Sequence, residues 1–331
     1  MKAAVNTVYG PADEVVRIED VARPEIRENE VLVKVYATSV STGAWRMVEM
    51  NARGTLQIVA RMIFGFFRPR NPIQGGSFSG RVVAIGASVT RFRLGDEVFG
   101  VVGAGAHAEY VAVPDEKTII AKPAALGYDE AAAMPFGGLT ALVFLRDFAK
   151  VQPGQKVLVT GASGGVGVFA VQIAEHLGAE VTGLTSTGNV AFVKSLGADR
   201  VIDYKRADFT RSGETHDVIL DTAGVSSFRQ VASLLAPGGR FVPPEFGVPE
   251  ILASMRSGRQ GRRIVIGVNG DTAADLEILA DLAARGVVRP VIDSIEPLAN
   301  IVDAYRRVAG RHKVGAVVID VDMPAASRAA A

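Results

Sequence analysis

A glycine-rich turn between a buried apolar run and a helical pattern is the clearest chemical signal in the sequence. A strand is predicted at Lys156–Thr160, it runs into Gly161–Gly167, and the stretch Gly165–Ala170 matches the pattern G-x-G-x-x-A. Glycines let the backbone approach a pyrophosphate closely, and the helix N-terminus that follows offers free N–H groups and a positive dipole end. Because the pattern follows a strand and opens a helix, it predicts a dinucleotide site rather than a purely structural turn.

The acidic residue that marks NAD-specific sites is missing where it is expected. In such sites a carboxylate roughly 20 residues after the glycines binds the ribose 2′-hydroxyl. Here that place falls in Thr185–Asn189, and no carboxylate occurs between Glu180 and Asp199. Hydroxyls and an amide accept a 2′-phosphate without charge repulsion, so the sequence favours NADPH; the alternative is an ordinary Ser/Thr-rich loop.

Other reaction chemistries find little support. The chain has no cysteine, which excludes disulfides, thiolate nucleophiles and Cys-bound zinc. The histidines are His107, His176, His216 and His312. None of them pairs at metal-ligand spacing, so no metal site is predicted. His107 is either a proton donor facing a cleft or, as favoured here, a packing residue. Ser163 lies between glycines, but its surroundings do not match the G-x-S-x-G turn of hydrolases.

Composition places the chain among soluble globular proteins. Its 331 residues predict two domains at roughly 150 residues each, and hydrophobic residues make up 48%. With 36 Lys and Arg against 35 Asp and Glu, no nucleic-acid partner is expected. The uncharged stretch Val157–Ala174 contains four glycines and is interpreted as a buried strand–turn–helix rather than a membrane span. We therefore expect a cytoplasmic protein with no membrane partner.

Three regions must position these residues. Residues 1–123 are mostly β, with apolar alternation from Val31 to Val35. In residues 124–268, apolar runs alternate with helical patterns, which predicts βαβ units and a doubly wound parallel sheet. The strand candidates there are Lys156–Thr160, Glu180–Thr185, Arg200–Tyr204, Asp217–Asp221, Gly239–Val242 and Ile264–Val268. Residues 269–331 hold a helix and a β run, Val314–Val321, which we expect to rejoin the first region.

Several short motifs match one known family. They are Gly154–Gly167, Gly95–Val98, Ala108–Val111, Gly138–Ala141 and Asp221–Gly224. Through them, residues 1 to 320 resemble the quinone oxidoreductase/zeta-crystallin branch of the medium-chain dehydrogenase/reductases. The resemblance implies an α/β fold in which a GroES-like β-rich catalytic domain accompanies a Rossmann domain, with the active site in the cleft between them.

The resemblance also implies roles for individual residues. Thr140 would contact the nicotinamide. The residues implied to cradle the pyrophosphate are Ser163, Gly164, Gly165, Val166 and Gly167. Those implied to surround the 2′-phosphate and adenosine are Ser186, Thr187, Asn189 and Tyr204.

Some family positions are altered in this chain. Gly188 and Asn189 stand where many relatives carry a basic residue near the 2′-phosphate, and the candidates to compensate are Lys194, Lys205 and Arg206. On the substrate side, Ser41 and Ala44 replace the family's Asn and Asp, and Ala316 replaces a Lys.

These features predict a zinc-independent reductase that transfers hydride from NADPH to a quinone or an α,β-unsaturated carbonyl compound. A cleft without zinc or a Tyr-x-x-x-Lys pair suits a delocalised enolate, which hydroxyls such as Ser41 or Thr42 can stabilise. The expected substrate is a small apolar carbonyl compound or quinone. Two alternatives stay open: a carbonyl/alcohol oxidoreductase on the same fold, and a non-enzymatic NADPH-binding protein. A homodimer is expected, because Ile264–Val268 would be an exposed sheet edge.

One stretch is not explained by this function. Between residues 53 and 70, arginines bracket a strongly apolar sequence, and they are Arg53, Arg61, Arg68 and Arg70. Three interpretations are a helix packed on the core, a mobile lid over a hydrophobic substrate, and a membrane-surface helix. The third is the least favoured from sequence, because the whole chain lacks a basic excess.

Overall fold

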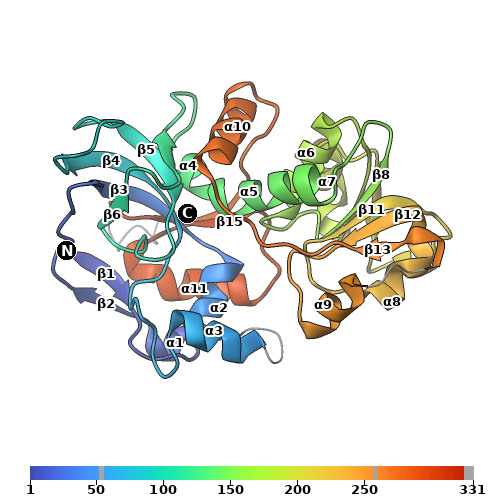
Figure 1. Cartoon of the computed structure of the whole chain (residues 1–331), viewed down its shortest axis with the longest axis horizontal. Coiled ribbons are helices and arrows are strands. Elements are labelled where there is room, and N and C mark those ends of the chain that lie inside the picture. The colour runs from blue at the N-terminus through green and yellow to red at the C-terminus, as the bar shows by residue number, and fades with distance from the viewer. Residues whose placement is uncertain (52–55, 256–258, 324–331) are drawn as a thin grey trace.

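Two β-sheets lie at opposite ends of the molecule with helices between them (Figure 1), in a computed structural model that describes residues 1–51, 56–255 and 259–323. The helices are α1 (Ala12–Val15), α2 (Thr42–Glu49), α3 (Leu56–Phe64), α4 (Tyr128–Ala133), α5 (Pro135–Val143), α6 (Gly167–His176), α7 (Val190–Ser195), α8 (Phe228–Val231), α9 (Val248–Ser254), α10 (Ala273–Ala284) and α11 (Ile301–Ala309). Within the described residues, no helix has the length and apolar content needed to cross a bilayer.

The first sheet combines strands from both ends of the chain. Its strands are β3 (Glu30–Val40), β4 (Ser77–Ile85), β5 (Glu97–Val101), β6 (Tyr110–Pro114), β7 (Ile119–Ala121), β14 (Ile292–Pro297) and β15 (Ala316–Asp320). A separate hairpin pairs β1 (Lys2–Val5) with β2 (Arg17–Asp20). The late strand β15 runs antiparallel to β3, with Val317 opposite Val40, so the last part of the chain does return to this sheet.

The second sheet is parallel throughout and has the order expected of a Rossmann domain. Its strands are β8 (Lys156–Thr160), β9 (Glu180–Thr185), β10 (Arg200–Asp203), β11 (His216–Asp221), β12 (Leu235–Val242) and β13 (Arg263–Ile264). They lie side by side as β10-β9-β8-β11-β12-β13, so the order in which successive strands are added reverses between β8 and β11. Ligands of such sheets bind outside the carboxyl ends of the strands at this reversal.

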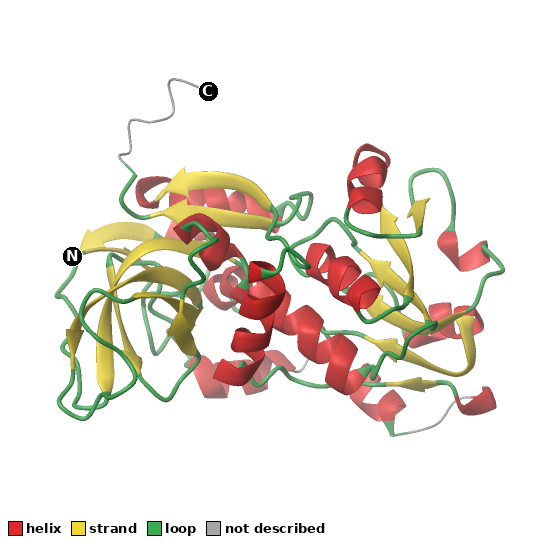
Figure 2. Ribbon diagram, turned by 90° about the horizontal axis from the view of Figure 1, so that it is seen from above, coloured by secondary structure: helices red, strands yellow, loops and turns green. Residues whose placement is uncertain are grey.

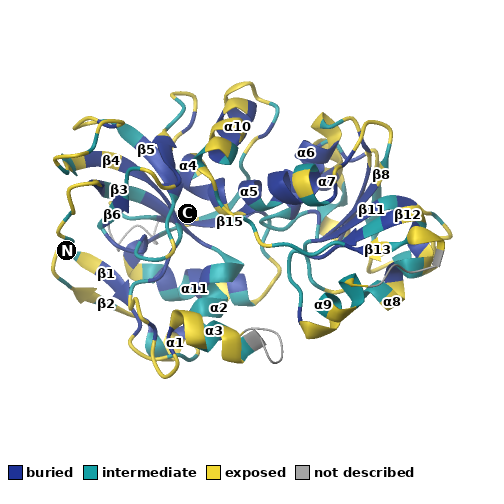
Figure 3. Ribbon diagram, viewed as in Figure 1, coloured by how far each residue is buried: buried dark blue, intermediate teal, exposed yellow. Residues whose placement is uncertain are grey.

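Both faces of the second sheet are covered, which explains why its strands are apolar at successive positions. In β8, Val157 and Val159 pack in the core beside α5, α6 and α10, whereas Leu158 packs on the opposite side near α8 and α9. Figure 2 shows helices on both faces, and Figure 3 shows the dark, buried strands between them. The predicted GroES-like and Rossmann architecture is confirmed.

The last strand of the second sheet is shorter than predicted. The sequence suggested Ile264–Val268, but β13 contains only Arg263–Ile264. The chain then leaves the sheet, and Gly267 lies against Phe148 so tightly that a Cβ there would come within 2.2 Å of the ring. Val268 is consequently 79% exposed. The homodimer expected from a longer edge stays a prediction.

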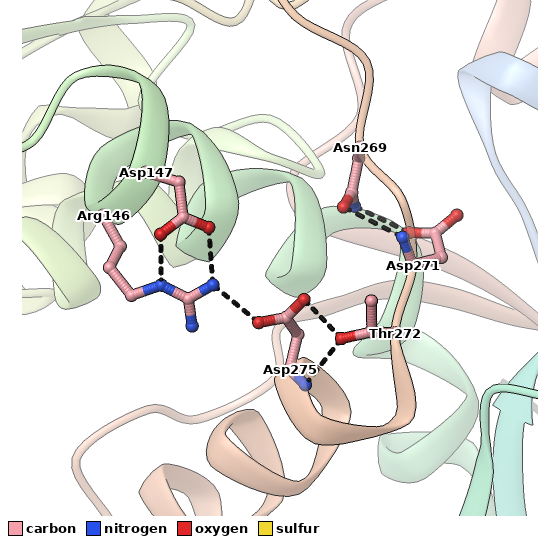
Figure 4. A network of polar contacts seen from close by, with 6 residues as sticks. All are labelled: Arg146, Asp147, Asn269, Asp271, Thr272 and Asp275. Carbon is pink, nitrogen blue, oxygen red and sulfur yellow. Dashed lines mark hydrogen bonds and ion pairs between the residues drawn. The ribbon is translucent and has the colours of Figure 1, made fainter.

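A polar network positions the segment that leaves this edge (Figure 4). Arg146 binds Asp147 through two hydrogen bonds and reaches Asp275 on α10 at 2.6 Å. Thr272 caps α10 by accepting a hydrogen bond from the Asp275 backbone at 3.1 Å. Just before the cap, the Asn269 amide donates to the Asp271 carboxylate at 2.6 Å. Arg146 and Asp147 lie in the helical turn Phe144–Phe148, which continues α5. The network therefore joins this turn to the start of α10.

Burial and the nearby charge of Asp275 raise the pKa of Asp271 from 3.8 to about 6. When folding raises the pKa of an acid, the folded state is most stable relative to the unfolded state below the unfolded pKa. This stability is lost as the pH rises through 6. We expect Asp271→Asn to raise the free energy of unfolding at pH 7.5 by up to about 3 kcal/mol, with no gain near pH 4.

Chemical denaturation at both pH values measures this difference. Asp281→Asn is the matched control, because Asp281 lies on α10 with its side chain 62% exposed. Equal stability of wild type and Asp271→Asn at pH 7.5 would contradict the assignment of a buried, destabilised carboxylate.

Candidate active site

A cavity of about 820 Å³ opens at the reversal point of the second sheet and is closed from the other side by the first. The second sheet contributes the glycine-rich turn after β8 and the loops after β9, β10 and β11. The other wall comes from the end of β3, the start of α2, and the loop between α11 and β15. The cavity therefore lies in the cleft that the sequence predicted.

The glycine-rich turn is close to other backbone on several sides. A Cβ on Gly137 of α5 would come within 2.0 Å of the Gly165 carbonyl oxygen, and one on Gly167 within 2.1 Å of the Gly161 oxygen. Of the predicted pyrophosphate residues, Ser163, Gly164, Gly165 and Val166 line the cavity. Gly167 does not line it; its place is in the close contact between helix and strand, which only glycine permits.

A buried carboxylate holds the neighbouring loop in place. Asp221, at the carboxyl end of β11, is 1% exposed and accepts a hydrogen bond from the Thr160 hydroxyl at 2.5 Å. It also accepts from the backbone N–H of Ser226 at 2.8 Å. The loop that it holds brings Thr222, Ala223 and Val225 to the cavity wall. The matched motif at this strand end is therefore a structural clamp.

The predicted 2′-phosphate region is partly assembled. Ser186, Asn189 and Tyr204 line the cavity, together with Thr185. The Asn189 amide donates to the Ser163 Oγ at 3.2 Å, which links this loop to the glycine-rich turn.

Thr187 departs from the prediction, because it does not line the cavity and its hydroxyl instead bonds Asp203 and lowers the pKa of that carboxyl. Of the candidate cations, Lys205 lines the cavity, whereas Arg206 pairs with Asp203 at 3.5 Å.

On the substrate side, two of the three predicted residues reach the cavity. Ser41 and Thr42 line it at the start of α2, where the Ser41 Oγ accepts a hydrogen bond from the Ala44 N–H at 3.0 Å. Thr140 does not line it. Its hydroxyl donates to the Phe136 carbonyl oxygen at 2.7 Å within α5, and Phe136, one turn earlier, takes the place at the wall.

His107 is a packing residue, and the proton-donor alternative is not supported. It is fully buried outside the cavity, and burial lowers its pKa to about 4. Its ring lies 3.1 Å from the Tyr305 hydroxyl and 3.2 Å from the Ser39 carbonyl oxygen. These contacts hold the end of β3, directly before Ser41, against α11.

The loop between α11 and β15 brings three basic residues that sequence reasoning missed, namely Arg311, His312 and Lys313. The Gly315 N–H donates to the Ser163 carbonyl oxygen at 2.9 Å, so this loop rests on the glycine-rich turn. The Lys313 ammonium lies 2.8 Å from where a Cβ on Gly165 would be. Burial lowers the pKa of Lys313 to about 8, against the attraction of Asp293.

The donor set fits an anionic dinucleotide. A cation lies beside the glycine-rich turn, and hydroxyls and Lys205 lie at the ends of β9 and β10. Where β3, α2 and α5 form the wall, Val40 and Phe136 lie beside the hydroxyls of Ser41 and Thr42. In the described part of the chain, no three His, Asp or Glu side chains gather as a possible metal site.

Comparisons with known proteins place this geometry in context. Residues 27–124 match the alcohol dehydrogenase GroES-like domain, and residues 196–319 match a zinc-binding dehydrogenase domain. The chain is 33% identical to the chloroplast envelope quinone oxidoreductase homolog of Arabidopsis thaliana, across 90% of this chain and 91% of that protein. It is 29% identical to the NADPH-dependent alkenal/one oxidoreductase of the same plant, across 96% of this chain and 79% of that protein.

A solved structure is similar over nearly the whole chain. The quinone oxidoreductase from Coxiella burnetii superposes with a TM-score of 0.86 at 29% sequence identity, covering 97% of this chain and 99% of that one. The likeness therefore includes both sheets and the cleft between them.

The position of Lys313 predicts proton uptake when a phosphorylated dinucleotide binds. The lysine is protonated below pH 8 and loses its charge above that value, so an anionic ligand raises its pKa again. Just above pH 8, the heat of NADPH binding should differ between buffers of different ionisation enthalpy. Lys313→Met should abolish this difference and weaken binding about tenfold or more. The exposed Lys194→Met is the control, and proton uptake unchanged in Lys313→Met would contradict the assignment.

Proposed function

The chain belongs to the medium-chain dehydrogenase/reductase family, in its quinone oxidoreductase-like branch, and on this premise we propose that it reduces α,β-unsaturated carbonyl compounds or quinones with NADPH. The observation that carries the proposal is the cavity itself. It joins a glycine-rich turn and basic side chains, suited to a dinucleotide, to a pair of hydroxyls on a largely apolar wall. NADPH supplies the hydride when it is bound.

The residues of this chain would position the reactants and receive developing charge. Because the Ser41 Oγ already accepts a hydrogen bond from the Ala44 N–H, its own proton is available to an oxygen in the cavity. Thr42 offers a second hydroxyl in the same wall. Phe136 and Val40 add apolar surface that excludes water, which strengthens these hydrogen bonds.

This wall suits conjugated substrates better than simple ketones. Reduction of a ketone places an alkoxide at the carbon that receives hydride, and this charge needs a metal or a strong acid close by. Reduction of a conjugated C=C places the charge on a carbonyl oxygen two bonds away, as a delocalised enolate. Neutral hydroxyls such as Ser41 and Thr42 are sufficient donors for that anion, so an enone or quinone is the substrate class proposed.

The preference for NADPH rests on the loops after β9 and β10. Ser186 and Asn189 present uncharged polar groups to the cavity, and Lys205 adds a positive charge at its rim. The relative from Arabidopsis thaliana whose name states NADPH dependence acts on alkenals and alkenones by the same name, which supports both parts of the proposal. Location in the cytoplasm and assembly as a homodimer stay predictions.

We propose a reaction without zinc, although one matched domain is described as zinc-binding. Support comes from the sequence, which has no cysteine, and from the cavity, where His312 is the histidine among the lining residues and lies beside cations rather than carboxylates.

Product analysis tests the reaction. An enone supplied with NADPH should yield the saturated ketone, whereas an allylic alcohol with the C=C intact would establish the carbonyl reductase alternative. Ser41→Ala combined with Thr42→Val should lower kcat roughly tenfold without abolishing turnover, because each removes one donor to a delocalised anion. Ser41→Asn is the matched control for the helix cap, since Asn also caps helices. Absence of NADPH oxidation with every enone and quinone would leave the non-enzymatic alternative.

Cofactor choice can be tested with two opposite charge changes. Ser186→Asp places a carboxylate in the cavity, where it would repel the 2′-phosphate. This variant should lower kcat/KM for NADPH by at least about tenfold and leave kcat/KM for NADH unchanged. Lys205→Met should also weaken NADPH selectively. The exposed Ser195→Asp should change neither. A wild-type enzyme that uses NADH as efficiently as NADPH would refute the preference.

Removal of metal tests the zinc-free reaction. We expect full activity after prolonged treatment with a strong chelator, because nothing in the proposed chemistry requires a Lewis acid. Elemental analysis of the purified protein should find no stoichiometric zinc. Loss of turnover that added zinc restores would overturn this part of the proposal.

A further inference from the structure

An apolar surface on α3 and the turn after it has no partner in the described chain. Its large side chains are between 41% and 85% exposed, with Phe67 the most exposed, and they are Ile58, Val59, Met62, Ile63, Phe64, Phe66 and Phe67. We call these residues the α3 surface; Figure 3 shows it in yellow along α3. None of them lines the cavity, so over residues 56–70 the interpretations as a core helix or as a substrate lid lose support, and residues 53–55 lie outside the described part of the chain.

The turn that carries the two aromatic residues is held rigidly. Gly65 has a φ of +124°, and a Cβ there would come within 1.9 Å of the Arg68 carbonyl oxygen. The Tyr9 hydroxyl donates to the Gly65 carbonyl oxygen at 2.9 Å, and Arg61 donates to that of Phe66 at 2.8 Å. Several polar contacts therefore hold the turn in which the rings of Phe66 and Phe67 are exposed to solvent. Such patches on a soluble domain mark interaction sites.

The charged residues in the segment that carries the α3 surface have one sign. Between Met50 and Pro72 the sequence has four arginines and no acidic residue, although the whole chain carries a net charge of only +1. Arg68 and Arg70 are exposed next to the aromatic residues, and Arg70 also donates to the Met62 carbonyl oxygen at 3.0 Å. Arg61 lies over the Tyr9 ring at 5.3 Å from its centroid. Because salt screens distant charges, a partner that approaches the α3 surface interacts with these local charges rather than with the net charge of the chain.

We propose that the α3 surface docks on an anionic lipid bilayer, with the apolar side chains in the interface and the arginines on lipid phosphates. Phe and aliphatic side chains on one face of a helix, with arginines beside them, are typical of segments that lie in the plane of a membrane interface. Docking between two copies of this surface is disfavoured, because a two-fold contact would bring the arginines together without any acid from the same segment.

In Figure 1, α3 lies beside α2 at the lower side of the molecule, the side on which α9 also lies. Arg46 of α2 pairs with Glu245, just before α9, at 2.6 Å, which joins the two halves of the molecule next to α3. On α9, Leu252 is 59% and Met255, just after it, 72% exposed, so apolar surface is present on both sides of this contact. Where the proposed function holds, a bilayer is also the reservoir of its apolar substrates.

Vesicle sedimentation of the full chain tests the docking directly. Vesicles of phosphatidylcholine mixed with phosphatidylglycerol should bind the protein at least about tenfold better than phosphatidylcholine alone, and added salt should weaken the binding. Phe66→Ser combined with Phe67→Ser should reduce binding about tenfold or more. Arg68→Gln should reduce it roughly fivefold.

The control variant is Leu94→Ser, which removes an equally exposed apolar side chain, 63% exposed, from the first domain and should leave binding unchanged. The proposal is overturned when the wild type does not sediment with anionic vesicles, or when the double Phe variant sediments as the wild type does. Light scattering that shows the double variant turning a dimer into a monomer would also overturn it, in favour of a contact between copies.

Turnover of a water-soluble quinone separates this proposal from the proposed function. The double Phe variant should oxidise NADPH with that substrate at the wild-type rate, because Phe66 and Phe67 lie outside the cavity. Vesicle binding without turnover would refute only the reductase, and turnover without vesicle binding would refute only the docking.

Discussion

Backbone meets backbone at the glycine-rich turn, and the rest of the cleft depends on that close approach. Gly137 and Gly165 are so near that neither a Cβ nor a small rotation could be accommodated, and the Gly315 N–H reaches the Ser163 carbonyl oxygen across the gap. Backbone contacts of this kind have no rotamers to vary, and the one between Gly315 and Ser163 ties the loop before β15 to the turn after β8. Gly137 and Gly165 both line the cavity, so a side chain at either place would also take up space in it.

Two charged residues near the cleft, Lys313 and Asp221, differ in how the protein compensates their charge. Burial disfavours the charge of Lys313, although Asp293 attracts it and its ammonium donates to the Gly315 carbonyl oxygen, and the fold tolerates this charge where an anion is expected. Asp221 is the opposite case, since backbone N–H groups and the Thr160 hydroxyl satisfy its carboxylate within the protein. Asp221 therefore stabilises the loop after β11, whereas Lys313 lies where an anionic ligand is expected to bind. This difference separates clamp residues from binding residues in motifs that look alike in sequence.

Sequence patterns predicted most of the second sheet, because β8 and β9 are apolar runs bounded by glycine or polar residues and buried on both faces. The same logic located Ser163 to Val166. Thr140 does not line the cavity, because a helical position one turn away, Phe136, faces it, and rotation of a helix is set by packing. The predicted contact of Thr140 with the nicotinamide stays a prediction. Lys313 was missed because its approach to Gly165 depends on the path of a loop across two domains. No local pattern encodes such a long-range contact.

The pairing of β3 with β15 has a consequence for how the chain is made. The strands of the second sheet come from one continuous stretch, so this sheet can form as soon as β13 has been synthesised. The end of β3, Ala37–Val40, lacks its partner on one side until β15 appears, after every strand of the other domain, whereas β6 pairs with Glu30–Lys34 earlier. During translation the growing protein therefore carries a short unpaired strand edge for most of its synthesis, and unpaired edges are places where nascent chains aggregate or recruit chaperones.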